Sequence, residues 1–122
     1  MSKLITNKNE IEQAIKNILE SESLLSIDED DFGNHEKIIG YQNFRLMNES
    51  SDFNYVINKK IANLTNKLIV NTACNSALTL AFLERILSNI REFYDSKIEI
   101  IYGCSNESLD DDIVVEIFLI SI

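Results

Sequence analysis

The stretch KLIVNTACNSALTLAFLERILSNIREFYDSKIEIIYG, residues 67–103, decides the fold class of this chain. It opens with KLIVNTA, an apolar run of strand length, and closes with KIEIIYG, a β-branched and aromatic run that also reads as a strand. Between them lies the strongest helical stripe in the sequence, formed by Leu80, Leu83, Ile86, Leu87, Ile90 and Phe93. The stretch therefore predicts a strand, a helix and a second strand that share one layered core.

Two further helices and a strand are predicted upstream of this stretch. Apolar residues at helical spacing predict a helix over 9–22, with Asn7 or Asn9 as its cap. GYQNFRLMN, residues 40–48, reads as a strand entered through a tight turn. A second full helix is predicted between Ser50 and Leu64, because the apolar residues there fall at helical spacing: Phe53, Val56, Ile57, Ile61 and Leu64.

The C-terminal run DIVVEIFLISI, residues 112–122, is apolar on both faces and should lie centrally in a sheet. CSNESLDDD, residues 104–112, suits a hairpin connection to it. The order of elements predicts an α+β fold, a two-layer sandwich in which a four-stranded mixed sheet is packed with helices. With 122 residues, one domain over 1–122 is expected.

Composition excludes several classes of function. Twenty acidic against eleven basic residues give a net charge of −9, which argues against binding to nucleic acid or to an anionic membrane. The sequence has neither a signal peptide nor an apolar run long enough to span a membrane, so a cytoplasmic location is expected. Three scattered glycines provide no glycine-rich phosphate loop, and no cofactor is expected.

The loop SIDEDDFGNHE, residues 26–36, is dense in acids and is the main candidate site. Aligning Asp28 with the first position of a calcium-binding EF-hand loop places Phe32 and Ile39 where two oxygen ligands are needed. A metal site is therefore not expected. The simplest interpretation is a solvated acidic turn, and the alternative is a set of carboxylates aimed at another protein.

The remaining candidate residues favour structural roles. His35, the single histidine, is not spaced to pair with a nucleophile and is interpreted as a surface or capping residue. Cys74 and Cys104 end predicted strands and should behave as small buried hydrophobes. The acids of SLDDDI, residues 108–113, fit a turn that keeps the sheet edge soluble.

The C-terminal half resembles the end of the C-terminal domain of FtsZ, the bacterial tubulin-like division protein. The resemblance is carried, in order, by LIVNTACN, ALTLAFL, IIYG and NESLDDDIVVEI, which are similar to family motifs of the types LLVNITGG, DLTLFEV, IIFG and DESLxDEIxVT. The chain departs from them at Cys74 and Asn75, where the family has glycines, and at its LISI end, where the family has ATGF.

The resemblance extends upstream and implies a function for the acidic loop. GYQNF is similar to the family's GYA strand, and 9–22 falls on the helix that joins the two halves of FtsZ. SIDEDDF falls on the N-x-D-x-x-D loop, whose carboxylates help a neighbouring subunit to hydrolyse GTP. The resemblance implies that Asp28 and Asp31 match the two aspartates, and that Ser26 replaces the asparagine.

The GTP-binding half of FtsZ has no counterpart in this chain, so the resemblance implies a domain that is not itself an enzyme. The implied function is interaction with FtsZ or a similar polymerising GTPase, with an effect on assembly or cell division, through Ser26, Asp28 and Asp31. Two alternatives remain open: a small-molecule-binding α+β domain, and a structural homo-oligomer whose acidic loop only promotes solubility.

Overall fold

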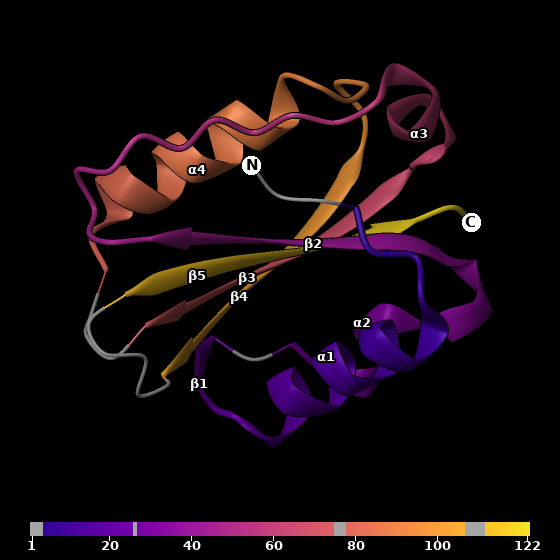
Figure 1. Ribbon diagram of the computed structural model, residues 1–122, viewed down its shortest axis with the longest axis horizontal. Helices are drawn as coiled ribbons and strands as arrows, with labels where there is room; N and C mark the ends of the chain where they lie inside the picture. Colours follow the sequence, from indigo (N-terminus) through magenta and orange to yellow (C-terminus); the bar gives the residue numbers. More distant parts are fainter. Residues whose placement is uncertain (1–3, 26, 75–77, 107–111) are drawn as a thin grey trace.

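The computed structural model describes residues 4–25, 27–74, 78–106 and 112–122, and its centre is a five-stranded sheet (Figure 1). The strands are β1 (Glu22–Leu25), β2 (Ile38–Leu46), β3 (Lys67–Cys74), β4 (Glu99–Asn106) and β5 (Ile113–Ile120). The helices are α1 (Lys8–Glu20), α2 (Glu29–Phe32), α3 (Lys59–Leu64) and α4 (Leu80–Arg91), with a short 3-10 helix, η1 (His35–Lys37). The α+β class predicted from the sequence is confirmed.

β3 is the middle strand of the sheet, in the order β1-β4-β3-β5-β2. It runs parallel to β4, to which α4 connects it, and antiparallel to β5. Leu68, Ile69 and Val70 are successive residues of β3 and are all fully buried. A strand covered on both faces loses the alternation of apolar and polar residues, which explains the continuous apolar run in the sequence.

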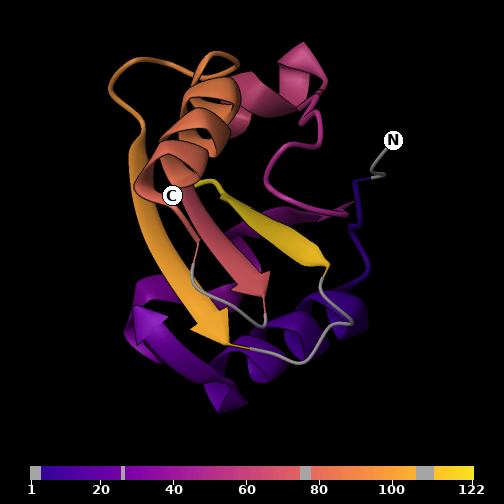
Figure 2. The same ribbon diagram turned by 90° about the vertical axis from the view of Figure 1, so that its left-hand side faces the viewer.

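Helices cover both faces of the sheet, so the sandwich has three layers where two were expected. Figures 1 and 2 show α4 on one face and α1 with α2 on the other. The α4 face holds the larger apolar cluster, which includes Ile86 and Ile90, and the α1 face holds a second cluster around Ile15 and Phe32. α1 and α4 each carry one apolar stripe, and each stripe is buried against its own face of the sheet.

The connection between the last two strands differs from the expected hairpin. β5 pairs with β3 on one side and with β2 on the other, so β3 separates β4 from β5. β5 is apolar on both of its faces, and both are buried because helices cover both faces of the sheet. Its predicted internal position is confirmed, whereas residues 107–111 of the connection lie outside the described part of the chain. The short edge strand β1, which the sequence did not indicate, pairs antiparallel with β4.

The predicted helix between Ser50 and Leu64 is wrong over most of its length. Only α3 is helical there, and it begins after Asn58, whose side chain accepts a hydrogen bond from the Lys60 amide at 2.8 Å. In the irregular segment before it, Phe53 and Tyr55 are buried while Val56 is 52% exposed. Burial every second residue is typical of an extended chain, and the apolar spacing was also compatible with the helical period that misled the prediction.

The helix predicted over 9–22 is confirmed as α1. Its cap is Asn7, whose side-chain oxygen accepts from the Glu10 amide at 3.1 Å. Its buried stripe consists of Ile11, Ala14, Ile15 and Ile18. Within the described ranges, no helix combines the length and apolarity needed to cross a bilayer.

Candidate functional site: an acidic turn beside a histidine

The acidic turn, Asp28–Asp31, lies between β1 and η1 on the α1 face of the sheet and forms the first part of α2. Apolar residues anchor it on both sides. Ile27 before it is buried and lies so close to Gly103 of β4 that a Cβ there would be 2.3 Å from its Cγ1 atom. Phe32 after it is buried, with its ring centroid 5.1 Å from that of Phe118 in β5. The anchors fix the backbone of the turn and leave its carboxylates near solvent.

The structure brings the two candidate aspartates together around the start of α2. Asp28 is the N-cap residue and is exposed, while Asp31 is half-buried. The Asp28 amide donates to Oδ2 of Asp31 at 2.8 Å, and the Asp31 amide donates to the Asp28 carbonyl at 3.0 Å. One oxygen of Asp31 therefore caps the helix. The third candidate, Ser26, lies outside the described residues.

Lys67, the first residue of β3, ties the end of the turn to the sheet. Its Nζ atom donates to the Asp31 backbone carbonyl at 2.6 Å. A short helix leaves its last carbonyls without partners within the helix, and the ammonium group satisfies one of them. The turn thus has a defined backbone and a carboxylate, that of Asp28, on the protein surface.

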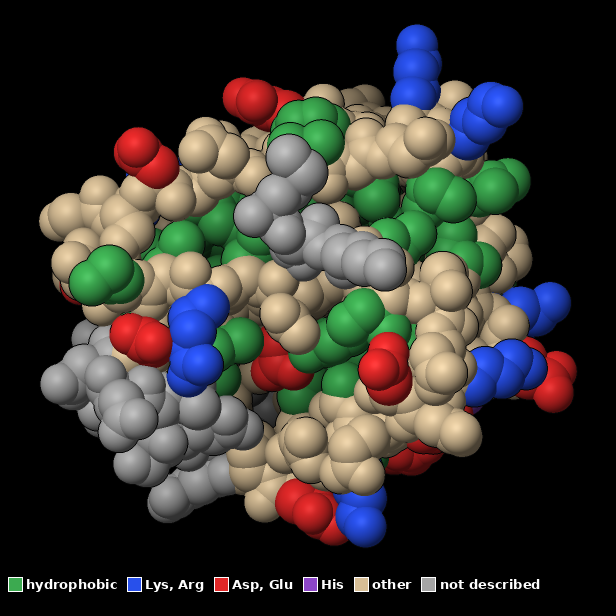
Figure 3. Space-filling view, viewed as in Figure 1, with side chains coloured by type: hydrophobic (Ala, Val, Ile, Leu, Met, Phe, Trp, Pro, Cys, Tyr) green, Lys and Arg blue, Asp and Glu red, His purple; other side chains and the backbone are tan. Residues whose placement is uncertain are grey.

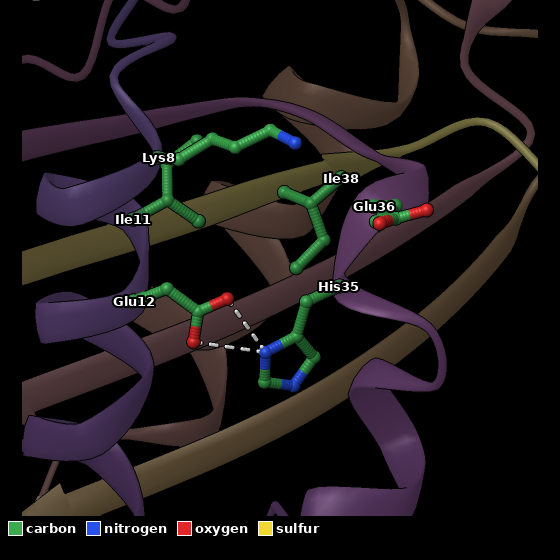
Figure 4. Close-up of a pocket in the computed structure, with 6 residues that line it drawn as sticks. All are labelled: Lys8, Ile11, Glu12, His35, Glu36 and Ile38. Carbon is green, nitrogen blue, oxygen red and sulfur yellow. Dashed lines mark hydrogen bonds and ion pairs between the residues drawn. The ribbon is translucent and has the colours of Figure 1, made fainter.

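His35 is the residue at this site that sequence reasoning missed. Its Nδ1 atom lies 2.8 and 2.9 Å from the two carboxylate oxygens of Glu12 in α1 (Figure 4), and its Nε2 atom lies 2.9 Å from Oε1 of Glu29 in α2. The side chain is 24% exposed. Where the sequence suggested a surface or capping residue, the structure has a bridge between two helices. No spacing in the sequence signals a pair that is 23 residues apart.

Two shallow hollows flank the Glu12–His35 pair. One, of about 90 Å³, lies between the start of α1 and η1 (Figure 4) and is lined by Lys8, Ile11, Glu12, His35, Glu36 and Ile38. The other, of about 380 Å³, opens along α1 and is lined by Glu12, Ile15, Lys16, Leu19, Glu20, Glu29 and His35. Both are open to solvent, unlike the closed apolar pocket typical of a small-molecule site. The described residues contain no group of His, Cys, Asp or Glu side chains suited to hold a metal ion.

The other candidates from the sequence are not part of the acidic turn. Cys74 and Cys104 are buried as predicted, and burial together with the neighbouring Cys74 raises the pKa of the Cys104 thiol, which makes it a poor nucleophile. Asp112 forms an ion pair with Arg45 at 2.8 Å, next to the start of β5. Asp110 and Asp111 lie outside the described residues.

Comparison with known proteins supplies a fold. No family model and no curated protein match the sequence. The structure is similar to that of an empty FtsZ dimer from M. jannaschii, with a TM-score of 0.59 and 11% identity over 93% of this chain and 38% of the other. A mutant of the same FtsZ gives 0.56 and 13%, over 93% and 39%. The chain spans less than two fifths of these proteins, and the matched part lacks the GTP-binding half. It therefore has the fold of an FtsZ-like C-terminal domain, as its motifs implied.

Proposed function

We propose that this chain is a non-enzymatic, FtsZ-like C-terminal domain that docks on FtsZ or a related polymerising GTPase and modulates its assembly, with cell division as the process affected. The observation that carries the proposal is the acidic turn, which presents Asp28 and Asp31 on an FtsZ-like fold. The FtsZ likeness by itself concerns the fold, so the partner and the effect on it are inferences from the turn.

The chemistry of the turn suits a nucleotide held by another subunit. A carboxylate that accepts a hydrogen bond from a water molecule makes that water a better nucleophile toward a γ-phosphate. The γ-phosphate itself must be bound by cations and backbone amides of the partner, because like charges would otherwise repel the turn. Asp28 is exposed and Asp31 has one oxygen engaged in the cap, so Asp28 is the better placed of the two to contact water.

A domain of this kind would occupy one end of a GTPase filament. It would offer the acidic turn to the nucleotide of the last subunit, but it would bring no nucleotide of its own for the next one. Growth at that end would stop, whereas hydrolysis in the last subunit would rise or fall with the geometry of Asp28. Capping and activation are thus two outcomes of the same contact.

The test is a titration of FtsZ from the same organism with this chain, read by GTPase rate and by sedimentation of polymer. The diagnostic variant is Asp28→Asn with Asp31→Asn, because an amide oxygen at position 31 still accepts the hydrogen bond that caps α2. Wild type should change both readouts saturably. The double variant should lose about tenfold or more of the effect, since a carboxylate that activates water cannot be replaced by an amide.

The matched control is Asp30→Asn with Glu36→Asn, which removes the same charge from two exposed carboxylates next to the site. It should behave as wild type if the contact requires Asp28 and Asp31, and as the diagnostic variant if only the negative field matters. Absence of any effect of the wild-type chain, at concentrations well above that of FtsZ, would refute the proposed function.

A further inference from the structure

His35 holds the acidic turn against α1 through two carboxylates that come from different helices. Glu12, in α1, contacts Nδ1 with both of its oxygens, and Glu29, the first residue of α2, contacts Nε2. Glu29 directly follows Asp28. The Glu29 contact therefore ties the start of α2, and with it Asp28, to α1, in addition to the buried anchors Ile27 and Phe32.

Both contacts are electrostatically favourable only when both ring nitrogens carry a proton. A neutral imidazole carries a proton on one nitrogen, and the other nitrogen then presents a lone pair. If Nδ1 keeps its proton for Glu12, a neutral His35 places the Nε2 lone pair 2.9 Å from a carboxylate oxygen of Glu29, which is repulsive. Nε2 is buried without a hydrogen bond of good geometry in the described residues, and Oε1 of Glu29 lies 2.9 Å from it.

We propose that His35 is a positioning residue whose protonation clamps the acidic turn to α1 and whose deprotonation releases it. The consequence for a GTPase partner rests on the proposed function, whereas the clamp itself does not. Histidine is the side chain that ordinarily changes charge between about pH 5 and 8, and this is the range over which the clamp is tested.

Most of the charged groups around His35 are carboxylates. The charged groups that face it or line the adjoining hollows are, from α1, Lys8, Glu12, Lys16 and Glu20, from α2, Glu29, and from η1, Glu36. On the side of the sheet it meets the apolar Ile38 and the ring of Phe32, whose centroid is 6.2 Å away. Acids outnumber lysines, and the two closest groups are both carboxylates.

The direction of the pH effect follows from this geometry. The clamp is complete when His35 is charged and the carboxylates of Glu12 and Glu29 are ionised. As the pH rises through the range of imidazole, the Glu29 contact turns from attractive to repulsive. The contact between the acidic turn and α1 is therefore weakened on the alkaline side and retained on the mildly acidic side.

Amide hydrogen exchange in the isolated chain tests the clamp without any partner. The reporter amides are those of Asp28, Asp31 and Gly33, which are bonded within the turn. Between about pH 5.5 and about pH 8, their protection factors should fall about three- to fivefold after correction for intrinsic rates, as expected for one partly buried ion pair. The amides of α4, on the other face, serve as the internal reference and should not follow.

Two variants and one control isolate the cause. His35→Gln, which is neutral at every pH, and Glu29→Gln, which keeps the Glu12 contact, should both abolish the pH dependence of the reporters. Glu29 is 60% exposed, so its replacement should leave the fold intact if His35→Gln does not. Glu36→Gln removes the same charge from the next residue and should retain the wild-type response. Equal protection at both pH values, or an unchanged response in Glu29→Gln, would overturn the proposal.

The same set of proteins separates this inference from the proposed function. If the wild-type chain loses its effect on FtsZ at about pH 8 while Glu29→Gln is pH-independent, both proposals stand. If exchange responds to pH but FtsZ never responds to the chain, the clamp stands and the proposed partner fails. If FtsZ responds to the chain but exchange does not change with pH, the clamp alone is wrong.

Discussion

The two faces of the sheet differ in how far their side chains are buried in an apolar cluster. On the α4 face, the apolar cluster is continuous and includes Phe53, Tyr55 and Ile86, and the buried hydroxyls of Tyr55 and Tyr94 are paired with each other. On the α1 face, the cluster is smaller and its margin is charged, with His35 set between Glu12 and Glu29. In Figure 3, red and blue side chains lie around the whole margin of the molecule, including the lower right, where Figure 1 places α1 and α2. The comparison suggests that one face stabilises the fold and that the other presents the site.

The largest expected effect comes from a cavity in the α4 face. Ile86 is fully buried against the sheet, and Ile86→Ala should lower the free energy of unfolding by about 2–5 kcal/mol, because the lost contacts leave a hole that the sheet cannot fill. Leu80, on the same helix but 71% exposed, is the control, and Leu80→Ala should cost less than about 0.5 kcal/mol. Urea unfolding followed by circular dichroism measures both. Similar losses in the two variants would show that α4 is not a stabilising layer.

The next effect concerns the buried polar network of the same face. The Tyr55 hydroxyl donates to Oε1 of Gln42 at 2.9 Å and also contacts the Tyr94 hydroxyl. Tyr55→Phe should cost about 1–3 kcal/mol, because it removes the hydrogen-bond partner of two buried groups, Oε1 of Gln42 and the Tyr94 hydroxyl. Tyr94→Phe leaves the bond from Tyr55 to Gln42 in place and should cost only about 0.5–1.5 kcal/mol. The reverse order, in urea unfolding of the two variants, would show that Gln42 is satisfied by another group.

For these two faces, the sequence predicted only the elements with a regular pattern of apolar residues. The stripes of α1 and α4 and the apolar runs of β3 and β5 could be recognised because each repeats one burial pattern over several turns or residues. Residues 52–58 could not, because Phe53, Val56 and Ile57 also satisfy a helical spacing and only the tertiary contacts of Tyr55 decide between the two. Strand order was equally hidden, since the sequence cannot tell whether β5 pairs with β4 or crosses to the far side of β3.

The candidate site was predictable in its acids but not in its architecture. The density of carboxylates and the family-like spacing of Asp28 and Asp31 pointed to the turn directly. The cap that uses Asp31 is local to the turn, but two other contacts join separate elements: Lys67 of β3 binds the Asp31 carbonyl, and His35 pairs with Glu12 of α1. These two contacts depend on how β3 and α1 pack against the turn, which a single sequence does not encode in any local pattern.

Alkaline pH should weaken the α4 face specifically. Burial raises the pKa of Tyr94 to about 12, and burial raises the pKa of Tyr102, whose hydroxyl donates to Thr72, to about 12 as well. In the unfolded chain tyrosine ionises near pH 10, so above that pH the unfolded state loses protons that the folded state keeps, and stability falls. Tyr94→Phe should remove roughly 1 to 2 kcal/mol of the loss between about pH 10 and pH 12. Parallel stability curves for wild type and variant would refute the assignment.

The last effect, which links stability to the site, is expected at Gly103 on the α1 face. A Cβ at this position would lie 2.3 Å from Cγ1 and 2.5 Å from Cδ1 of Ile27, so Gly103→Ala must displace that side chain, which precedes Asp28. Ile27 is buried and β-branched, so it cannot simply swing away, and the cost should be about 1–3 kcal/mol.

The displacement should nevertheless reach the acidic turn, where the exchange of the Asp28 and Asp31 amides should accelerate while the α4 amides do not. A double-mutant cycle with Ile27→Ala provides the control. If the clash is the cause, the two substitutions will cost less together than the sum of their separate effects, because the shortened side chain no longer meets the new methyl group. Strict additivity would mean that Gly103 acts through β4 itself, and the α1 face would then owe the placement of its carboxylates to the sheet rather than to the packing of Ile27.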